Sequence, residues 1–367
     1  MSIVLRLTDR RLTAPRDVAR ALSPLAGFAL DACYFGVVWV LRGDLEYFWQ
    51  EYGQPNPNSR QPCIMCPATT NADDPVQLHE YRGGQMRWLS RIYSKAQFFT
   101  TRYSAHALFH KVHGGISSLT FMPDLLHCKH LGTDQYFYAS VVWLLIYVIL
   151  PDGHADNLKT IFDHIKDQYG TLNIEQRFQN MTLNMISNKT DPPTKFPCLK
   201  GKGAECRHLG AALQPVFESY MNVDNLQHNQ INIALKHSVA IERILSDYKD
   251  CFRFTDNVGR EFKDHCFAFL LAFNALANFY SKEVRVMLFD VTMKAHYLGH
   301  IGLLALHINP RLGWAYSGED MMRHCKQLMS SCVRGTPLAL GSEKFGDKYR
   351  IAMGLKLCGD QREPLLK

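Results

Sequence analysis

Two cysteines separated by two residues, Cys63 and Cys66, are the sharpest chemical signal in the sequence. Two thiolates at this spacing in a tight turn can chelate one zinc ion, at about 2.3 Å each. They supply half of a tetrahedral site, and three pairs elsewhere could complete it: His127 with His130, Cys206 with His208, and His296 with His300. We favour His296 and His300, because a helix places residues four apart on one face. Buried thiols and ordinary helical histidines are the simpler alternative.

Carboxylates form the second chemical group, and Asp44 is the first of them. Asp44 directly follows Gly43 at the end of an expected strand, where open α/β sheets place functional side chains. It could equally cap the helix that follows. Glu319 has the same ambiguity, because a carboxylate in the first turn of a helix also complements the helix dipole. We expect Ser317 to cap that helix.

Two further blocks compete for these roles. Asp124 and His127 could position DNA, supply metal ligands, or cap a helix that begins near Thr133. Glu205 follows a basic, glycine-rich turn and is the rival for a third catalytic carboxylate. Asp124, His127, His130 and Glu205 together could surround one ion in a different metal-dependent hydrolase.

The elements that must position these residues are an α/β start followed by a predominantly helical body. We expect a strand over 3–7, a helix over 14–32, a strand over 36–43 with a helix after it, and a loop over 54–75. Apolar residues at helical spacing occupy 134–149, 204–221, 230–248 and 261–280, followed by a short strand over 284–289 and helices over 296–308 and from 317. The apolar run 141–150 is too short to span a membrane and predicts a buried helix.

Length, charge and cysteine content bound the class of protein. The 367 residues can bury a substantial core and predict about two domains, or one fold with a large insertion. The net charge of +7 permits a polyanionic partner without requiring one. Eleven scattered cysteines, with no apolar signal core at the N-terminus, favour a reducing intracellular compartment.

The order and spacing of these features resemble a known family. Cys63 follows Asp44 by 19 positions, a long helical block intervenes, and Glu319 follows His300 by 19. This arrangement resembles the RNase H-like DDE transposases of cut-and-paste DNA elements, in the branch of the CACTA and Transib elements and the V(D)J recombinase core. The chain also resembles a widespread group of element-derived proteins of dinoflagellate algae, which carry similar GDLEYF, CxxC, DxxHxKHLGxDQYF, LKGKxAE and GEDMM blocks.

The resemblance implies roles for the matching residues. Asp44 would be the second catalytic aspartate and Glu319 the catalytic glutamate, and both would bind catalytic Mg²⁺. Structural Zn²⁺ would be held by Cys63, Cys66, His296 and His300. An active chain would be a two-metal DDE-type transposase or nuclease, which needs carboxylates that hold the two ions roughly 4 Å apart.

The resemblance also implies an organisation and a function. Residues 1–62 and 284–367 would form a partial RNase H-like core, and 63–283 a zinc knuckle and an all-helical insertion. Before Asp44 only Asp9 follows a strand-like run, so we expect the core to be truncated at its N-terminus, without its first catalytic aspartate. The expected function is that of a transposase-derived DNA-binding protein in the nucleus, without a membrane segment and capable of homo-oligomerisation. The alternative is a non-enzymatic helical binding protein with a structural zinc site.

Overall fold

The computed structural model describes residues 2–7, 36–82, 86–102, 117–186, 194–333, 340–341 and 343–351. It divides into two compact units, Met1–Trp314 and Ala315–Lys367. The first unit contains the sheet, the helical body and the predicted zinc ligands. The second contains α12 (Tyr316–Val333). The expected division into a core over 1–62 and 284–367 and an insertion over 63–283 stays a prediction.

A small mixed sheet opens the first unit. Its strands are β1 (Ser2–Leu7), β2 (Gly36–Gly43) and β3 (Phe121–Pro123), in that order across the sheet. β1 runs antiparallel to β2, and β3 runs parallel to it, with Leu41 paired to Phe121 and Gly43 to Pro123. The strands predicted over 3–7 and 36–43 are therefore confirmed.

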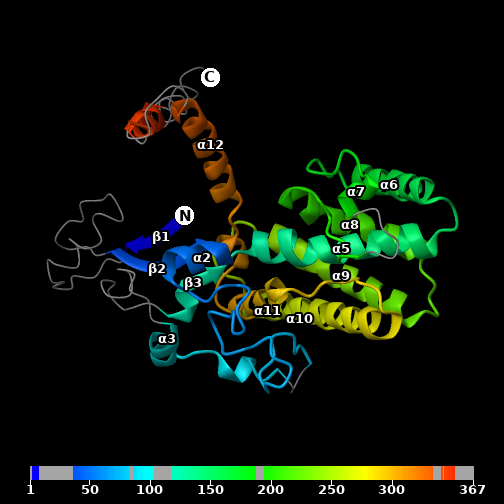
Figure 1. The fold of residues 1–367 in the computed structure, drawn as a ribbon, viewed down its shortest axis with the longest axis horizontal. Helices are drawn as coiled ribbons and strands as arrows, with labels where there is room; N and C mark the ends of the chain where they lie inside the picture. Colours follow the sequence, from blue (N-terminus) through cyan, green and yellow to red (C-terminus); the bar gives the residue numbers. More distant parts are fainter. Residues whose placement is uncertain are drawn as a thin grey trace. The chain divides into compact units, whose positions relative to one another are not determined.

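Helices make up most of the rest of the first unit (Figure 1). Four short helical elements lie between β2 and β3 along the chain: α2 (Leu45–Tyr52), η1 (Leu89–Arg91), α3 (Lys95–Arg102) and η2 (Ser118–Thr120). The body contains η3 (Leu126–Thr133), α5 (Asp134–Leu144), η4 (Leu145–Ile149), α6 (His154–Thr171), α7 (Leu183–Ile186), α8 (Gly203–Tyr220), α9 (Leu226–Asp247), α10 (Asp256–Phe279), η5 (Tyr280–Val284), α11 (Met293–Leu304) and η6 (Pro310–Gly313). The predicted helical body is confirmed, whereas an RNase H-like core stays a prediction.

Side-chain caps set two helix starts that the apolar spacing places too late. Asn225 accepts hydrogen bonds from the amides of Gln227 and His228, so α9 begins at Leu226 rather than near 230. Thr255 accepts from the Val258 amide, so α10 begins at Asp256. Such caps satisfy amides that have no partner within the helix.

Two local predictions are wrong. The segment 284–289 is not a strand, because η5 continues α10 to Val284 and the backbone then turns through positive φ at Arg285 and Phe289. Ser317 does not precede α12, which already begins at Tyr316. The helix expected over 14–32 and the candidate Asp9 lie outside the described residues.

The core joins α11 closely to α10. A side chain at Gly259 of α10 would come within 2.8 Å of the Ala305 carbonyl oxygen, so only glycine permits this approach. A Cβ on Gly302 of α11 would lie 3.2 Å from the Cys266 Cβ. This contact fixes α11, which carries His296 and His300, within the buried interior.

Candidate metal centre

The structure brings Cys63, Cys66, His296 and His300 into one buried cluster. Their four candidate ligand atoms all lie within 4.8 Å of one another. Cys63 Sγ is 3.4 Å from His300 Nε2, and Cys66 Sγ is 3.3 Å from His296 Nε2. The two Nε2 atoms are 3.1 Å apart. A tetrahedral zinc ion separates its ligand atoms by about 3.3 Å for two nitrogens to about 3.8 Å for two sulfurs, so small shifts of these side chains would accept one ion.

The cysteine turn has the backbone geometry of a thiolate ligand loop. The Met65 amide donates to Cys63 Sγ at 3.3 Å, and the Ala68 amide donates to Cys66. Amides that point at sulfur stabilise the negative charge of a thiolate. The Ile64 amide donates to the Tyr297 hydroxyl of α11 at 2.8 Å, which attaches the turn directly to the helix that carries the histidines.

The surroundings of the two imidazoles orient them toward the thiols. His296 donates its Nδ1–H to the Leu78 carbonyl oxygen at 2.8 Å, so its Nε2 lone pair faces Cys66. A ligand histidine held in this way through its other nitrogen is typical of zinc sites. Trp88 meets both rings edge-on, at 4.8 Å between centroids. His300 Nδ1 is buried without a hydrogen-bond partner among the described residues.

The electrostatics of the cluster favour a cation. Burial by itself raises the pKa of Cys63, but the hydrogen bond with Cys66 and the two histidines outweigh it and hold the pKa well below its usual value. Burial and the neighbouring Cys63 raise the pKa of Cys66. Burial also lowers the pKa of His300, which keeps this imidazole neutral. Two cysteines, one of them with a lowered pKa, and two histidines are a donor set that binds Zn²⁺ with release of protons. The residues therefore fit a structural zinc ion.

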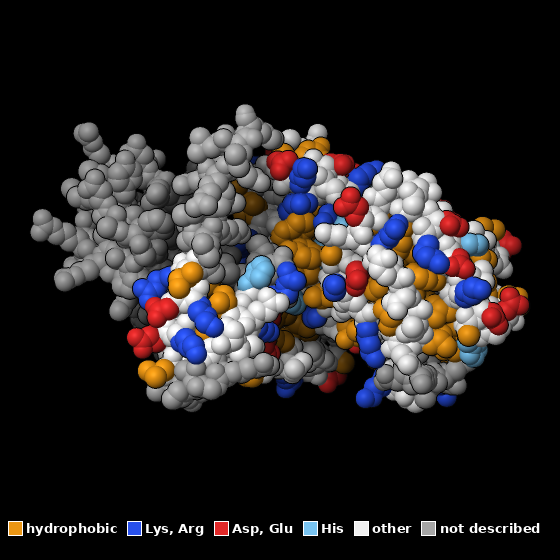
Figure 2. Space-filling model, turned by 90° about the horizontal axis from the view of Figure 1, so that it is seen from above, with side chains coloured by type: hydrophobic (Ala, Val, Ile, Leu, Met, Phe, Trp, Pro, Cys, Tyr) orange, Lys and Arg blue, Asp and Glu red, His pale blue; other side chains and the backbone are white. Residues whose placement is uncertain are grey.

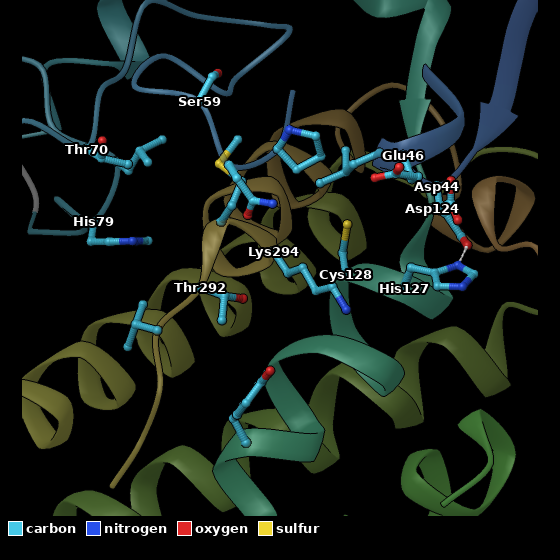
Figure 3. Close-up of a pocket in the computed structure, with 17 residues that line it drawn as sticks. Asp44, Glu46, Ser59, Thr70, His79, Asp124, His127, Cys128, Thr292 and Lys294 are labelled. Atoms are coloured by element: carbon cyan, nitrogen blue, oxygen red, sulfur yellow. Dashed lines mark hydrogen bonds and ion pairs between the residues drawn. The ribbon is translucent and has the colours of Figure 1, made fainter. Parts of the chain in front are cut away.

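A cavity of about 660 Å³ lies beside this centre. Gly43 pairs with Pro123 at the ends of two parallel strands. The residues that directly follow these strands, Asp44 and Asp124, both line the cavity. In Figure 3 Asp44 and Asp124 appear near Glu46 at one side, whereas Ser59, Thr70 and His79 are drawn at the other. Lys294 and Cys128 also line the cavity. Leu78 and His79 belong to its wall, so the metal centre and the cavity share a loop.

Both aspartates also have local structural roles. Asp44 caps α2, and its Oδ1 accepts the Tyr47 amide at 2.7 Å. Asp124 is almost fully buried; its Oδ1 accepts the Leu126 amide at 2.9 Å, and its Oδ2 pairs with His127 Nδ1. Both carboxylates therefore already serve local structure.

The rival residues take separate partners. His130 Nε2 contacts Glu242 at 2.8 Å. Glu205 Oε2 accepts the Lys202 amide at 2.7 Å and caps α8. Cys206 and His208 also lie on α8, outside the Cys/His cluster. The set of Asp124, His127, His130 and Glu205 is thus divided among different contacts. Glu319 lies in the first turn of α12, in the second unit, and its predicted role beside Asp44 stays a prediction.

Sequence reasoning missed a buried ionic network. Lys129 is fully buried and lies 2.9 Å from Asp134 and 3.1 Å from Glu242, and it donates to Ser238 at 3.0 Å. Burial alone would lower the pKa of Lys129, yet Asp134 and Glu242 raise it, so the ammonium stays charged. His130, Asp134 and Glu242 could by type hold a metal, but the Lys129 ammonium contacts both carboxylates. No spacing in the sequence signals this network.

No protein-family model matches this chain, and no curated protein or solved structure does either. The candidate site therefore rests on its own geometry.

Proposed function

We propose that this chain is a DNA-binding protein derived from a cut-and-paste transposase, built around a structural zinc centre. Its cavity would hold a divalent metal such as Mg²⁺ between Asp44 and Asp124. The observation that carries the proposal is the position of these two aspartates, which follow paired residues at the carboxyl ends of adjacent parallel strands and line one cavity. Such strand ends are where α/β sheets bind ligands.

The chemistry of the cavity supports a phosphate-bearing ligand. Carboxylate oxygens are the ligands that Mg²⁺ prefers, and the ion usually binds substrate phosphates at its remaining positions. Lys294 in the wall adds a positive charge and donates to the Leu131 carbonyl oxygen at 2.6 Å. A bound metal would position a phosphodiester and stabilise the charge that develops on it.

The net charge of the protein is consistent with binding to a polyanion. Lys and Arg outnumber Asp and Glu by 41 to 34. Figure 2 shows the Lys and Arg side chains spread across the viewed face among acidic ones, rather than gathered in one patch. The net positive charge permits salt-dependent contacts to a nucleic-acid backbone, although the described residues of this face show no basic patch that would mark where they form. Among the described helices, none is both long and apolar enough for a transmembrane span.

The test is binding of a short DNA duplex with and without Mg²⁺. We expect Mg²⁺ to strengthen binding by the unaltered protein and to have little effect in Asp44→Asn, which keeps an acceptor for the helix cap but loses the charge. Asp156→Asn, at an exposed position of α6, is the matched control. Glu319→Gln tests the predicted third carboxylate in the same assay. The same Mg²⁺ response in Asp44→Asn as in the control would contradict the proposal.

A second candidate is a non-enzymatic helical binding protein with the same structural zinc. The observation that favours it is that both aspartates already serve local structure, since Asp44 caps α2 and Asp124 accepts from Leu126. This candidate expects that Mg²⁺ does not bind and that Asp44→Asn leaves every nucleic-acid property unchanged. The DNA-binding assay therefore separates the two.

A further inference from the structure

A pair of histidines joins α9 to α10 away from the metal centre. His237 Nδ1 of α9 lies 2.8 Å from His265 Nδ1 of α10. Both side chains are partly exposed. At this distance the contact is an imidazole–imidazole hydrogen bond, in which one Nδ1 carries the proton and the other accepts it. Each neutral ring can also carry its proton on Nε2, which leaves its Nδ1 lone pair free for a metal ion placed between the two rings.

A neighbouring carboxylate favours the required tautomer of His265. Glu261, one turn earlier on α10, places Oε1 3.6 Å from His265 Nε2. A carboxylate on this side of the ring favours the proton at Nε2 and leaves the Nδ1 lone pair directed at His237. Glu261 also faces Arg243 of α9 at 3.5 Å, so the charges next to the histidines nearly cancel. Burial lowers the pKa of His237, and His265 lowers it further, which keeps His237 uncharged at neutral pH.

We propose that His237 and His265 form a second metal site, which binds a transition-metal dication such as Zn²⁺, Ni²⁺ or Cu²⁺ through their Nδ1 atoms. Imidazole is a preferred ligand for these ions, and water would complete the coordination. At metal–nitrogen distances of about 2.1 Å the two nitrogens would lie roughly 3.0 Å apart in square-planar or octahedral geometry and roughly 3.4 Å apart in tetrahedral geometry. A small rotation of two partly exposed side chains provides either spacing. The site clamps α9 to α10.

This site differs in character from the Cys/His centre. The four ligands there are buried and include two thiols, whereas this pair is partly exposed and purely imidazole. A metal ion at this pair would exchange readily with ions in solution, and the loss of that ion would leave the core of the molecule intact. The two sites can therefore be measured separately.

The experiment is a calorimetric Ni²⁺ titration of the full chain after one equivalent of zinc per chain has been added and unbound or exchangeable zinc has been removed by dialysis. We expect one further equivalent in the unaltered protein and its loss in both His237→Ala and His265→Ala. Glu261→Gln should weaken binding by about tenfold, because it removes the charge that orients His265. The matched control is His164→Ala, which removes a histidine of α6 that stacks on Tyr220 and should keep the equivalent.

A spectroscopic readout keeps the test independent of the variants. The electron paramagnetic resonance spectrum of bound Cu²⁺ should show coupling to two nitrogens in the unaltered protein. A spectrum without nitrogen coupling, the absence of the extra equivalent, or an equal equivalent in both histidine variants would overturn the proposal.

Discussion

His296 donates its Nδ1–H to the Leu78 carbonyl oxygen at 2.8 Å, across 218 residues of sequence. The bond fixes the ring so that Nε2 faces the cysteines, and it holds the loop whose next residue, His79, lines the cavity. The same loop is anchored twice more, by Asn274 at the His79 carbonyl and by Trp88 at the Glu80 carbonyl. The metal centre therefore also supports one wall of the cavity.

Metal removal should loosen the cysteine turn before the helical body. The amides of Met65 and Ala68 bond to the two sulfurs, so their hydrogen exchange should accelerate when a chelator removes the metal. The Leu235 amide, in the buried part of α9, is the internal control and should keep its protection. Equal protection of Met65 and Ala68 with and without metal would show that no metal holds the turn.

Asp44 variants should separate helix capping from metal binding. Asp44→Ala removes the acceptor for the Tyr47 amide and should lower the free energy of unfolding by about 1 kcal/mol. Asp44→Asn keeps an acceptor, so its stability should stay within about 0.5 kcal/mol of the original. Denaturant unfolding measures both. Equal destabilisation by the two variants would mean that the charge, rather than the cap, stabilises this position.

The ionic network around Lys129 should contribute strongly to stability at neutral pH. Glu242→Gln leaves His130, Lys129 and Arg207 without a charged partner at this position and should lower the free energy of unfolding by about 3 kcal/mol. Glu218→Gln, which breaks an exposed pair with Lys236, is the matched control and should change it by less than about 1 kcal/mol.

The same network predicts how stability responds to acid. Burial alone would raise the pKa of Glu242, but Lys129, His130 and Arg207 hold it well below 4.5. A depressed pKa stabilises the folded state fully above the unfolded value, and this stabilisation is lost as pH falls below about 4.5. Asp134 acts in the opposite sense, because burial raises its pKa. Between neutral and acidic pH, the free energy of unfolding should fall less steeply in Glu242→Gln than in the unaltered protein. Parallel curves of this free energy against pH for the two proteins would contradict this assignment.

Two glycines should respond oppositely to alanine. A Cβ on Gly210 of α8 would lie 2.3 Å from the Tyr138 hydroxyl, which bonds to Ser238 at 2.8 Å, so Gly210→Ala should cost about 1 to 3 kcal/mol. Gly170 of α6 has open space around it, and Gly170→Ala should stabilise the helix by up to about 1 kcal/mol. Thermal unfolding compares them. A stability gain in Gly210→Ala would show that Tyr138 can move aside.

Some residues of the candidate site could be predicted from their type and their spacing in the sequence. CxxC in a turn and HxxxH on a helix each place two ligands by local geometry, and Asp44 follows a recognisable strand and turn. Asp124 carries the same signal, an apolar run that ends in aspartate, but its three-residue strand is too short to identify without its partner β2.

Contacts that depend on the assembled fold were not predictable. The Leu78 carbonyl and the Trp88 ring have no local property that marks them as support for a metal site. His130 and Glu242 lie 112 positions apart, and only the packing of η3 on α9 brings them together. The segment 284–289 is rich in strand-forming residues, but no neighbouring strand lies beside it among the described residues, so β-propensity alone misleads there.

Metal analysis of the purified protein tests the central claim most directly. After extensive dialysis, which removes exchangeable metal from the exposed histidine pair, the four-ligand centre predicts one zinc per chain. This zinc should be lost together with about 4 kcal/mol or more of stability in Cys63→Ser and in His300→Ala. Cys251→Ser, which alters an exposed cysteine, should keep both the zinc and the stability. Zinc content that stays the same in Cys63→Ser and His300→Ala as in Cys251→Ser would contradict the account.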